Sequence, residues 1–270
     1  PVSHTWVVDT APPNTTITAS EPDPTNDATA DFTFTSTQTG STFACSVDGG
    51  SFAPCTSPFA TAALLDGPHT FAVRATDGAG NTDPTPATAS ATVDTTNPDT
   101  TIASNPSDPT NDTTGDFTFT SSEPGTFQCN LDGAGFAACG ASFTTGVLSS
   151  ASHTLLVRAI DSAGNTDASP ASFTWTVDTV APVSAFEATE PNPTSDPTGD
   201  FSFTSSEPGT FECNLDSAGF SACSAAFTTP SLADGSHTLA VRARDQAGNV
   251  DATPVSHTWV VDTAPPNTTI

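Results

Sequence analysis

The sequence predicts an all-β chain of tandem seven-stranded β-sandwiches joined head to tail in a rod. The tripeptide Val-Asp-Thr returns with its Asp at positions 9, 94, 178 and 262, which are 85, 84 and 84 residues apart. Between these landmarks the same motifs recur in the same order, as expected of repeated structural units. Short alternating segments are separated by Gly, Pro, Asp and Asn about every 8–12 residues, a spacing typical of sandwiches. No segment shows sustained helical periodicity with capping residues.

Seven strands are expected in the first repeat. Alternation of apolar and polar residues places them at 14–20, 31–36, 42–48, 51–55, 59–64, 69–76 and 87–93. Within the second of these, Phe32 and Phe34 share one face and Thr33 and Thr35 the other, because side chains alternate along a strand. Seven antiparallel strands give two packed sheets in each repeat.

A longer period lies on top of the domain repeat, because residues 1–17 are identical to residues 254–270. The other junctions resemble this segment only loosely, so the identity predicts a 253-residue unit of three distinct domains. We expect the chain to be a part of a longer array. The predicted boundaries are 1–9 for the last strand of a preceding repeat, 10–94, 95–178 and 179–262 for repeats 1 to 3, and 263–270 for the first strand of a following repeat.

Three cysteine pairs are expected to reinforce these small domains, whose cores are marginal. Every pair has the form Cys-x9-Cys across an Asp-Gly or Asp-Ser turn, which suits a disulfide across a hairpin. The pairs are Cys45 with Cys55, Cys129 with Cys139, and Cys213 with Cys223. The alternative is metal ligation, but two cysteines without a second pair make a poor zinc site. Because disulfides persist in oxidising compartments, we expect an extracellular or cell-surface protein.

The charge is strongly acidic, with 30 Asp and Glu against 4 Lys and Arg and a net charge of −26. Such a surface repels nucleic acid and anionic membranes, and it attracts divalent cations. The alternative interpretation is that the charge provides solubility and suppresses aggregation. No apolar run approaches transmembrane length, so we expect no membrane insertion of this segment.

Acidic loops are expected to meet where one domain follows another, because loops between successive strands alternate between the two poles of a sandwich. At the first joint the residues brought together are Asp23, Asp27, Asp66, Asp94, Asp161, Asn165 and Asp167. At the second joint they are Asp108, Asp112, Asp178, Asp245, Asn249 and Asp251. Hard oxygen ligands at this density suit Ca²⁺, which takes six to eight of them. The alternative is that Asp-x-Ala-Gly-Asn is only a tight turn.

The sequence offers no catalytic constellation, and we expect a non-enzymatic protein with no cofactor other than the Ca²⁺ that the acidic joints suit. His69, His153 and His237 begin the sixth strand of each repeat in phase with its buried face, so they are expected to be structural. Serine and aspartate are abundant, but no nucleophile elbow surrounds them. At another recurring position, each arginine is expected to pair with a carboxylate on the sheet surface; these are Arg74, Arg158 and Arg242.

The segment 73–87 (VRATDGAGNTDPTPA), followed by Val-Asp-Thr, resembles the tandem immunoglobulin-like repeats of large bacterial surface adhesins and extracellular repeat filaments. The resemblance covers essentially the whole chain. It implies an immunoglobulin-like sandwich, and it supports interdomain calcium as a stiffening device. The chain departs from antibody domains because it has no Tyr, and hence no tyrosine corner, and because its disulfides lie within hairpins.

The sequence is compatible with two kinds of function, a structural one and a ligand-binding one. The first is a structural segment of a giant repetitive protein, forming a filament or an adhesin stalk, with further copies of the same repeat as partners in one chain or between subunits. Its proline-bearing linkers are semi-rigid. The alternative is a carbohydrate- or surface-binding module, which would need an exposed aromatic platform. The tryptophans argue against that, because Trp175 and Trp259 are in phase with buried strand residues and Trp6 is a copy of Trp259.

Overall fold

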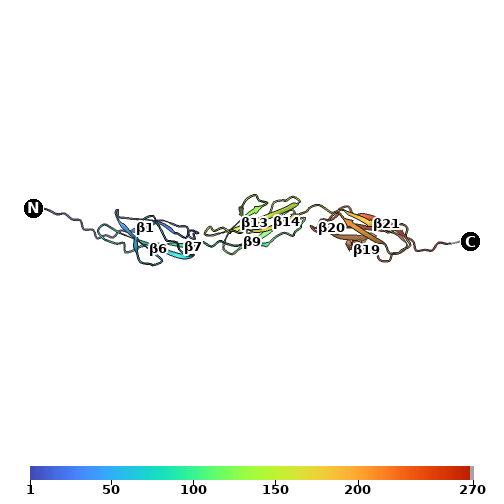
Figure 1. Cartoon of the computed structure of the whole chain (residues 1–270), viewed down its shortest axis with the longest axis horizontal. Coiled ribbons are helices and arrows are strands. Elements are labelled where there is room, and N and C mark those ends of the chain that lie inside the picture. The colour runs from blue at the N-terminus through green and yellow to red at the C-terminus, as the bar shows by residue number, and fades with distance from the viewer. Residues whose placement is uncertain (268–270) are drawn as a thin grey trace.

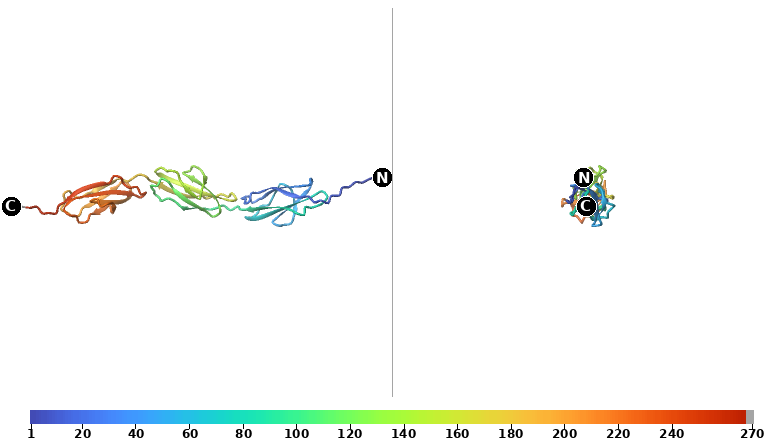
Figure 2. Two further views of the ribbon diagram at one scale, coloured as in Figure 1. Left: turned by 180° about the vertical axis from the view of Figure 1, so that it is seen from behind. Right: turned by 90° about the vertical axis from the view of Figure 1, so that its left-hand side faces the viewer.

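In the computed structural model, which describes residues 1–267, three β-sandwiches follow one another along a narrow rod with the termini at opposite ends (Figures 1 and 2). Every secondary-structure element in this range is a β-strand. The predicted all-β fold class, with tandem sandwiches, is confirmed. No part of the described chain forms a helix long and apolar enough to cross a membrane.

Repeat 1 contains seven strands in two antiparallel sheets, with orders β1-β2-β5 and β4-β3-β6-β7. The strands are β1 (Thr15–Ser20), β2 (Asp31–Ser36), β3 (Thr42–Val47), β4 (Ala53–Cys55), β5 (Phe59–Ala60), β6 (Gly67–Thr76) and β7 (Ala87–Val93). All predicted ends agree within two residues except the end of the fifth strand. Thr61 N still donates to Ala30 O, in register with β2, but Ala30 N donates to the side-chain Oγ1 of Thr61 at 3.0 Å and not to its carbonyl, so the ladder of β5 ends at Ala60.

Repeats 2 and 3 reproduce this topology. The strands of repeat 2 are β8 (Thr100–Ser104), β9 (Asp116–Ser121), β10 (Gly125–Leu131), β11 (Ala137–Cys139), β12 (Ser142–Thr144), β13 (Ala151–Asp161) and β14 (Ala171–Val177). Those of repeat 3 are β15 (Ser184–Ala188), β16 (Asp200–Ser205), β17 (Gly209–Leu215), β18 (Ser221–Cys223), β19 (Ala226–Thr228), β20 (Gly235–Asp245) and β21 (Val255–Val261).

The two terminal segments lie outside these strands. Residues 1–9, predicted to be the last strand of a preceding repeat, pair with no sheet here, and Trp6 within them is 72% exposed. The predicted strand at 263–270 has no strand in its described part, and its residues 268–270 lie outside the described residues. Both assignments stay predictions.

The two edges of each sandwich are joined by a parallel bridge. In repeat 1, Thr25 lies beside Val93 of β7, with Thr25 N donating to Thr92 O and Asp94 N donating to Thr25 O, both at 2.9 Å. Equivalent bridges join Thr110 to Val177 and Thr194 to Val261. The segment after the first strand is therefore tied directly to the last strand of the same domain.

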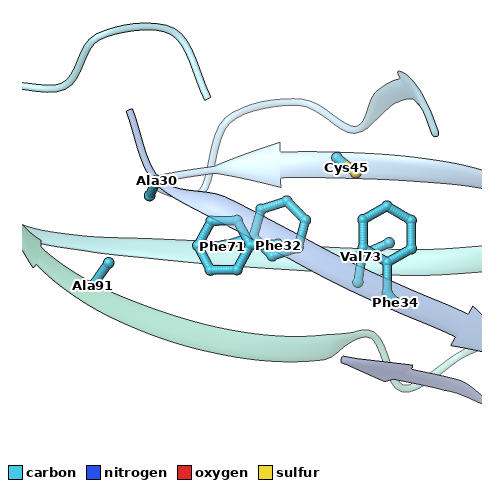
Figure 3. Close-up of a cluster of buried hydrophobic side chains, with 7 residues drawn as sticks. All are labelled: Ala30, Phe32, Phe34, Cys45, Phe71, Val73 and Ala91. Carbon is cyan, nitrogen blue, oxygen red and sulfur yellow. The ribbon is translucent and has the colours of Figure 1, made fainter. Parts of the chain in front are cut away.

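The core of repeat 1 is built from inward-facing aromatic and small residues (Figure 3). Phe32 of β2 stacks on Phe71 of β6 with ring centroids 4.1 Å apart. Ala30 and Ala91 lie at one end of this pair, and both are buried. Burial of such side chains supplies most of the favourable free energy of folding.

Repeats 2 and 3 fill the same space differently. Trp175 stands where repeat 1 has Ala91, since it pairs with His153 as Ala91 pairs with His69. A Cβ added at Gly115 would lie 3.0 Å from the indole carbon Cζ2 of Trp175. Repeat 3 repeats this arrangement with Gly199 and Trp259, whereas repeat 1 has Ala30 beside the small Ala91. Tryptophan and glycine are therefore coupled choices, because a close-packed core accepts a larger residue only where its neighbour is smaller.

Candidate metal centres at the domain joints

Each domain receives the linker from the preceding domain in a turn at the end of its sixth strand. At the first joint, Asn165 Nδ2 donates to Asp94 O at 2.7 Å and to Asp161 Oδ2 at 2.8 Å. Asp161 Oδ1 accepts from Gly164 N and Asn165 N, which closes the turn. The second joint has the same contacts, with Asn249 Nδ2 donating to Asp178 O at 2.8 Å. The asparagine thus connects the body of one repeat to the chain that arrives from the previous one.

Three carboxylates gather at each of these joints. At the first joint, carboxylate oxygens of Asp94, Glu123 and Asp161 all lie within 4.8 Å of one another. At the second joint the corresponding group is Asp178, Glu207 and Asp245. In each group one aspartate belongs to the linker, the glutamate follows the second strand of the domain, and the other aspartate, which is buried, ends the sixth strand.

The crowding of carboxylates raises the pKa of the glutamate in each group. The pKa of Glu123 is raised above its ordinary value by partial desolvation and then by the negative charges of Asp94, Asp161 and Asp66. Partial desolvation and the charges of Asp178 and Asp245 raise the pKa of Glu207 in the same way. Like charges held this close disfavour full ionisation. A cation bound among them would remove this repulsion.

Asp161 differs in the direction of its shift. Desolvation, the largest contribution, acts to raise the pKa of its carboxyl, but hydrogen bonds from Asn165 and from backbone N–H groups outweigh it and lower the pKa. Asp161 therefore stays ionised and offers a fixed negative charge at the joint.

Glu123 and Glu207 are absent from the set of residues predicted from the sequence. The signal was present, because repeats 2 and 3 share the segment Ser-Ser-Glu-Pro-Gly at 121–125 and 205–209. The pairing of strands brings this segment to the joint. Gly125 lies directly opposite Asp161, and a Cβ there would come 2.1 Å from Ile160 O, so the two backbones approach closely.

Other predicted ligands bond within their own domain. Asp23 and Asp108 each accept a hydrogen bond from a backbone N–H of the last strand, at 2.9 Å, which holds the loop against that strand. Asp27 and Asp112 each accept from the backbone N–H two residues further on, the pattern of an Asx turn. These four are not among the three-carboxylate groups.

Asp167 and Asp251 are nearly inaccessible, with 2% and 3% of their surface exposed. Asp167 Oδ2 accepts from Thr100 N at 3.0 Å, and Asp251 Oδ2 from Ser184 N at 2.8 Å. They fix the start of the first strand in each domain, the role that Asp83 plays in repeat 1.

Asp66 lies beside the first joint and has no acidic counterpart at the second. Its carboxylate accepts from Thr95 N at 3.0 Å and from Thr96 Oγ1 at 2.9 Å in the linker. The equivalent residue in repeat 2 is Ser150, whose hydroxyl bonds to Thr179. The first joint therefore carries one more negative charge than the second.

The three cysteine pairs are disulfide-bonded in the structure. Cys45–Cys55, Cys129–Cys139 and Cys213–Cys223 have S–S distances of 2.05, 2.09 and 2.06 Å. Each bond joins the two strands of one hairpin at the edge of the four-stranded sheet. Metal ligation is thereby excluded for the cysteines, since none is free.

The histidines form structural pairs with aspartates in the preceding hairpin turns. His69 Nδ1 lies 2.8 Å from Asp48 Oδ2, and His69 Nε2 lies 2.7 Å from Leu65 O. Asp48 adopts a positive φ of 49°, and its carboxylate also accepts from Thr70 N at 2.9 Å. His153 and His237 make the same contacts. Both ring nitrogens are occupied, as the sequence led us to expect.

These pairs predict a pH dependence of stability. Hydrogen bonding to aspartate, followed by that to a backbone carbonyl, raises the pKa of all three histidines above 6.5. Hydrogen bonding to His69 lowers the pKa of Asp48 below 3.8. A raised histidine pKa contributes stability that is complete below about pH 6.5 and is lost as the pH rises through the folded value, and the lowered aspartate pKa contributes above about pH 4. We expect a higher melting temperature at about pH 5.5 than at about pH 8.5 in chelator.

The matched control for this dependence is the His69→Asn, His153→Asn, His237→Asn variant. In this variant, the difference in melting temperature between the two pH values should be mostly lost. The other carboxylates titrate alike in both proteins and do not affect the comparison. Scanning calorimetry of both proteins at fixed ionic strength measures it. An equal pH difference in the two proteins would show that the pairs do not contribute.

The arginine prediction is correct for one repeat of three. Arg242 Nε pairs with Glu212 Oε2 at 2.7 Å. Arg158 instead donates to Gln128 Oε1, and Arg74 faces Ala44 on the neighbouring strand, because the cross-strand partner differs between repeats. All three guanidinium groups share a feature that the sequence analysis missed, a cation–π contact of 4.1–4.2 Å with Phe52, Phe136 or Phe220.

No protein-family model and no curated protein matches the chain. Among solved structures it is similar to a 1.5-MDa bacterial ice-binding adhesin studied for host cell surface retention (19% identity, 95% of this chain, 100% of that chain, TM-score 0.41). It is also similar to a tetra-tandem repeat in the extending region of a large adhesion protein (19% identity, 94% of this chain, 74% of that chain, TM-score 0.32). A third similar structure is that of the fibronectin(III)-like modules of CbhA from Clostridium thermocellum (16% identity, 60% of this chain, 93% of that chain, TM-score 0.38). These neighbours are adhesin repeat domains and fibronectin-III-like modules.

Proposed function

We propose that this chain is a structural, non-enzymatic segment of a large repetitive extracellular or cell-surface protein, where it forms part of a filament or an adhesin stalk. The observation that carries the proposal is the way each linker is received by the next domain, through Asn165 to Asp94 O and Asn249 to Asp178 O. A repeated seat of this kind sets the direction of every domain relative to the previous one. Length is then gained by adding repeats.

Further contacts across the joints support a semi-rigid rod. Asn111 N, in the loop after β8, donates to Ala247 O of repeat 3 at 3.1 Å. At the first joint the side chain of Asn26 lies against Gly164, where an added Cβ would be 3.5 Å from Asn26 Nδ2. The hairpin disulfides and the acidic surface suit an oxidising extracellular setting. The partners are further copies of the same repeat, in one chain or between subunits.

The aromatic side chains give less support to a carbohydrate-binding module. Such a module needs an aromatic face open to the ligand. Among the described residues, Phe52, Phe136 and Phe220 each have one face covered by an arginine guanidinium. Trp175 and Trp259 are fully buried.

We further propose that each three-carboxylate group holds a divalent cation, with Ca²⁺ as the ion. The donor set contains only carboxylate oxygens, which suit a hard cation, and it carries up to three negative charges in a small volume. Asp94, Glu123 and Asp161 would hold the ion at the first joint, and Asp178, Glu207 and Asp245 at the second. A bound ion would neutralise the repulsion and clamp the linker aspartate to the body of the following domain.

Calcium is therefore expected to stabilise and straighten the chain. Calorimetry should show a higher melting temperature in millimolar Ca²⁺ than in chelator, since a ligand present at about 100 times its dissociation constant stabilises by about 2.7 kcal/mol. Small-angle X-ray scattering should show a larger maximum dimension. The Glu123→Ala, Glu207→Ala variant should respond weakly, and the control Glu187→Ala, which alters an exposed glutamate of β15, should respond like the parent. Superimposable melts and equal dimensions in the two buffers would reject the cation sites.

A further inference from the structure

A third linker is present in the structure, ahead of repeat 1, and it is seated like the other two. Asn81 Nδ2 donates to Asp9 O at 3.0 Å, as Asn165 does to Asp94 O. Ala11 N donates to Asp9 Oδ1 at 3.0 Å, and the linkers ahead of repeats 2 and 3 repeat this contact. The three linkers can therefore be compared position by position.

The alignment at these seats is fixed by a hydrogen bond common to all three repeats. Asn14 N donates to Thr37 Oγ1 at 2.9 Å in repeat 1. The equivalent bonds in repeats 2 and 3 run to Ser122 Oγ and Ser206 Oγ, also at 2.9 Å. The residue after each of these hydroxyl residues is Gln38 in repeat 1 and glutamate in the other two. The loop of repeat 1 is one residue longer, but the extra residue follows Gln38.

Gln38 makes a contact that a carboxylate cannot make. Its Nε2 donates to Ala11 O in the linker at 2.8 Å. An ionised glutamate has no proton to donate to a carbonyl oxygen, whereas a side-chain amide has two. The body of repeat 1 therefore reaches the linker through a direct hydrogen bond, at the position where Glu123 and Glu207 stand beside two aspartates.

The charge at this joint is also lower. Asp9 and Asp77 correspond to Asp94 and Asp161, and the third acid is replaced by the neutral Gln38. Asp77 is held by its own turn, with Asn81 Nδ2 donating to Asp77 Oδ2 at 2.9 Å. Between residues 1 and 267, three-carboxylate groups are found at the linkers ahead of repeats 2 and 3 and not at the linker ahead of repeat 1.

We infer that the joint ahead of repeat 1 is closed by the protein's own Gln38 amide and needs no cation, so that one of the three joints in this chain is independent of calcium while the other two are not. The contrast with the other joints rests on the proposed cation sites. The Gln38 bond itself does not. Removing calcium would then loosen the joints ahead of repeats 2 and 3 and leave the joint ahead of repeat 1 intact.

The test follows the protection of backbone amides in residues 9–14 of the full chain by hydrogen exchange. The Ala11 amide donates to Asp9 Oδ1, and Gln38 holds the carbonyl of the same residue, so this amide reports whether the linker stays seated. In chelator, the parent protein should protect the Ala11 amide. Gln38→Ala should reduce this protection roughly threefold to tenfold, the range for loss of one hydrogen bond. Addition of calcium should leave both values unchanged. Gln246→Ala, which removes an exposed glutamine of repeat 3, is the matched control and should leave residues 9–14 as in the parent.

The variant Gln38→Glu extends the test, because it recreates the acidic trio. Its linker should be loose in chelator and protected in calcium. The inference is overturned if Gln38→Ala keeps the parent's protection, or if calcium increases protection of the parent's residues 9–14. Failure of the proposed cation sites looks different, since the melting of the parent would then ignore calcium while the Gln38→Ala effect in chelator persists.

Discussion

Replacing Trp259 with alanine is expected to destabilise repeat 3 by about 3–5 kcal/mol, the cost of truncating a buried tryptophan. Its indole is 0% exposed and packs edge-on against Phe201 with centroids 5.0 Å apart. Within the described residues Trp259 Nε1 has no hydrogen-bond partner, so the loss is one of packing and not of a polar contact. The substitution would leave a cavity in place of the indole, and the neighbouring Gly199 has no side chain to fill it.

The chain contains its own control for this substitution. Trp6 stands in an identical sequence, residues 1–17, yet it is 72% exposed. Trp6→Ala should therefore leave all three domains as stable as in the parent. Hydrogen exchange followed by mass spectrometry separates the repeats, and only peptides of repeat 3 should lose protection in Trp259→Ala. Equal protection of repeat 3 in the two variants would show that the indole does not hold the core.

Removing one disulfide should have the second largest effect. The Cys213→Ala, Cys223→Ala variant is expected to lose about 2–3 kcal/mol of stability in repeat 3, because closing the loop restricts the unfolded chain. Cys213 also lies in the core at 5% exposure, so its truncation adds a packing loss.

Urea unfolding of repeat 3, followed by the same peptides, measures this loss. Reduction of the parent protein separates the two contributions, because it breaks the bond and leaves both sulfur atoms in place. A urea midpoint unchanged by reduction would mean that the cross-link contributes nothing. Repeats 1 and 2 of the double variant, with their own disulfides intact, serve as internal references.

The sequence was sufficient for the fold because alternation and turn residues are local signals. Phe32 and Phe34 marked the buried face of β2, and both are 2% exposed. The end of β5 was not predictable in this way. It depends on a hydrogen bond from Ala30 N to the side-chain hydroxyl of Thr61, which is a contact between distant parts of the chain.

The joints show the same division. Asp94 and Asp161 were predicted to meet because strand order alone sends their loops to facing poles, and they do lie together. Glu123 was missed because its position depends on the register between β10 and β13, which pairs Gly125 with Asp161. The same argument from strand order placed Asp167 at the joint. In the structure Asp167 is instead buried beneath the start of β8, where it accepts a hydrogen bond from Thr100 N.

The parallel bridge of each sandwich would determine how a domain responds to a pull along the rod. A pull along the rod enters a domain near its first strand and leaves through its last, so the bonds that tie Thr25 to Thr92 and Asp94 are loaded in shear and must break together. The disulfide lies outside this load path, and it spans only 10 residues of the neighbouring hairpin. Once the bridge fails, the cross-link holds back that short loop alone, and the rest of the domain is free to extend under the force that all domains in the series share.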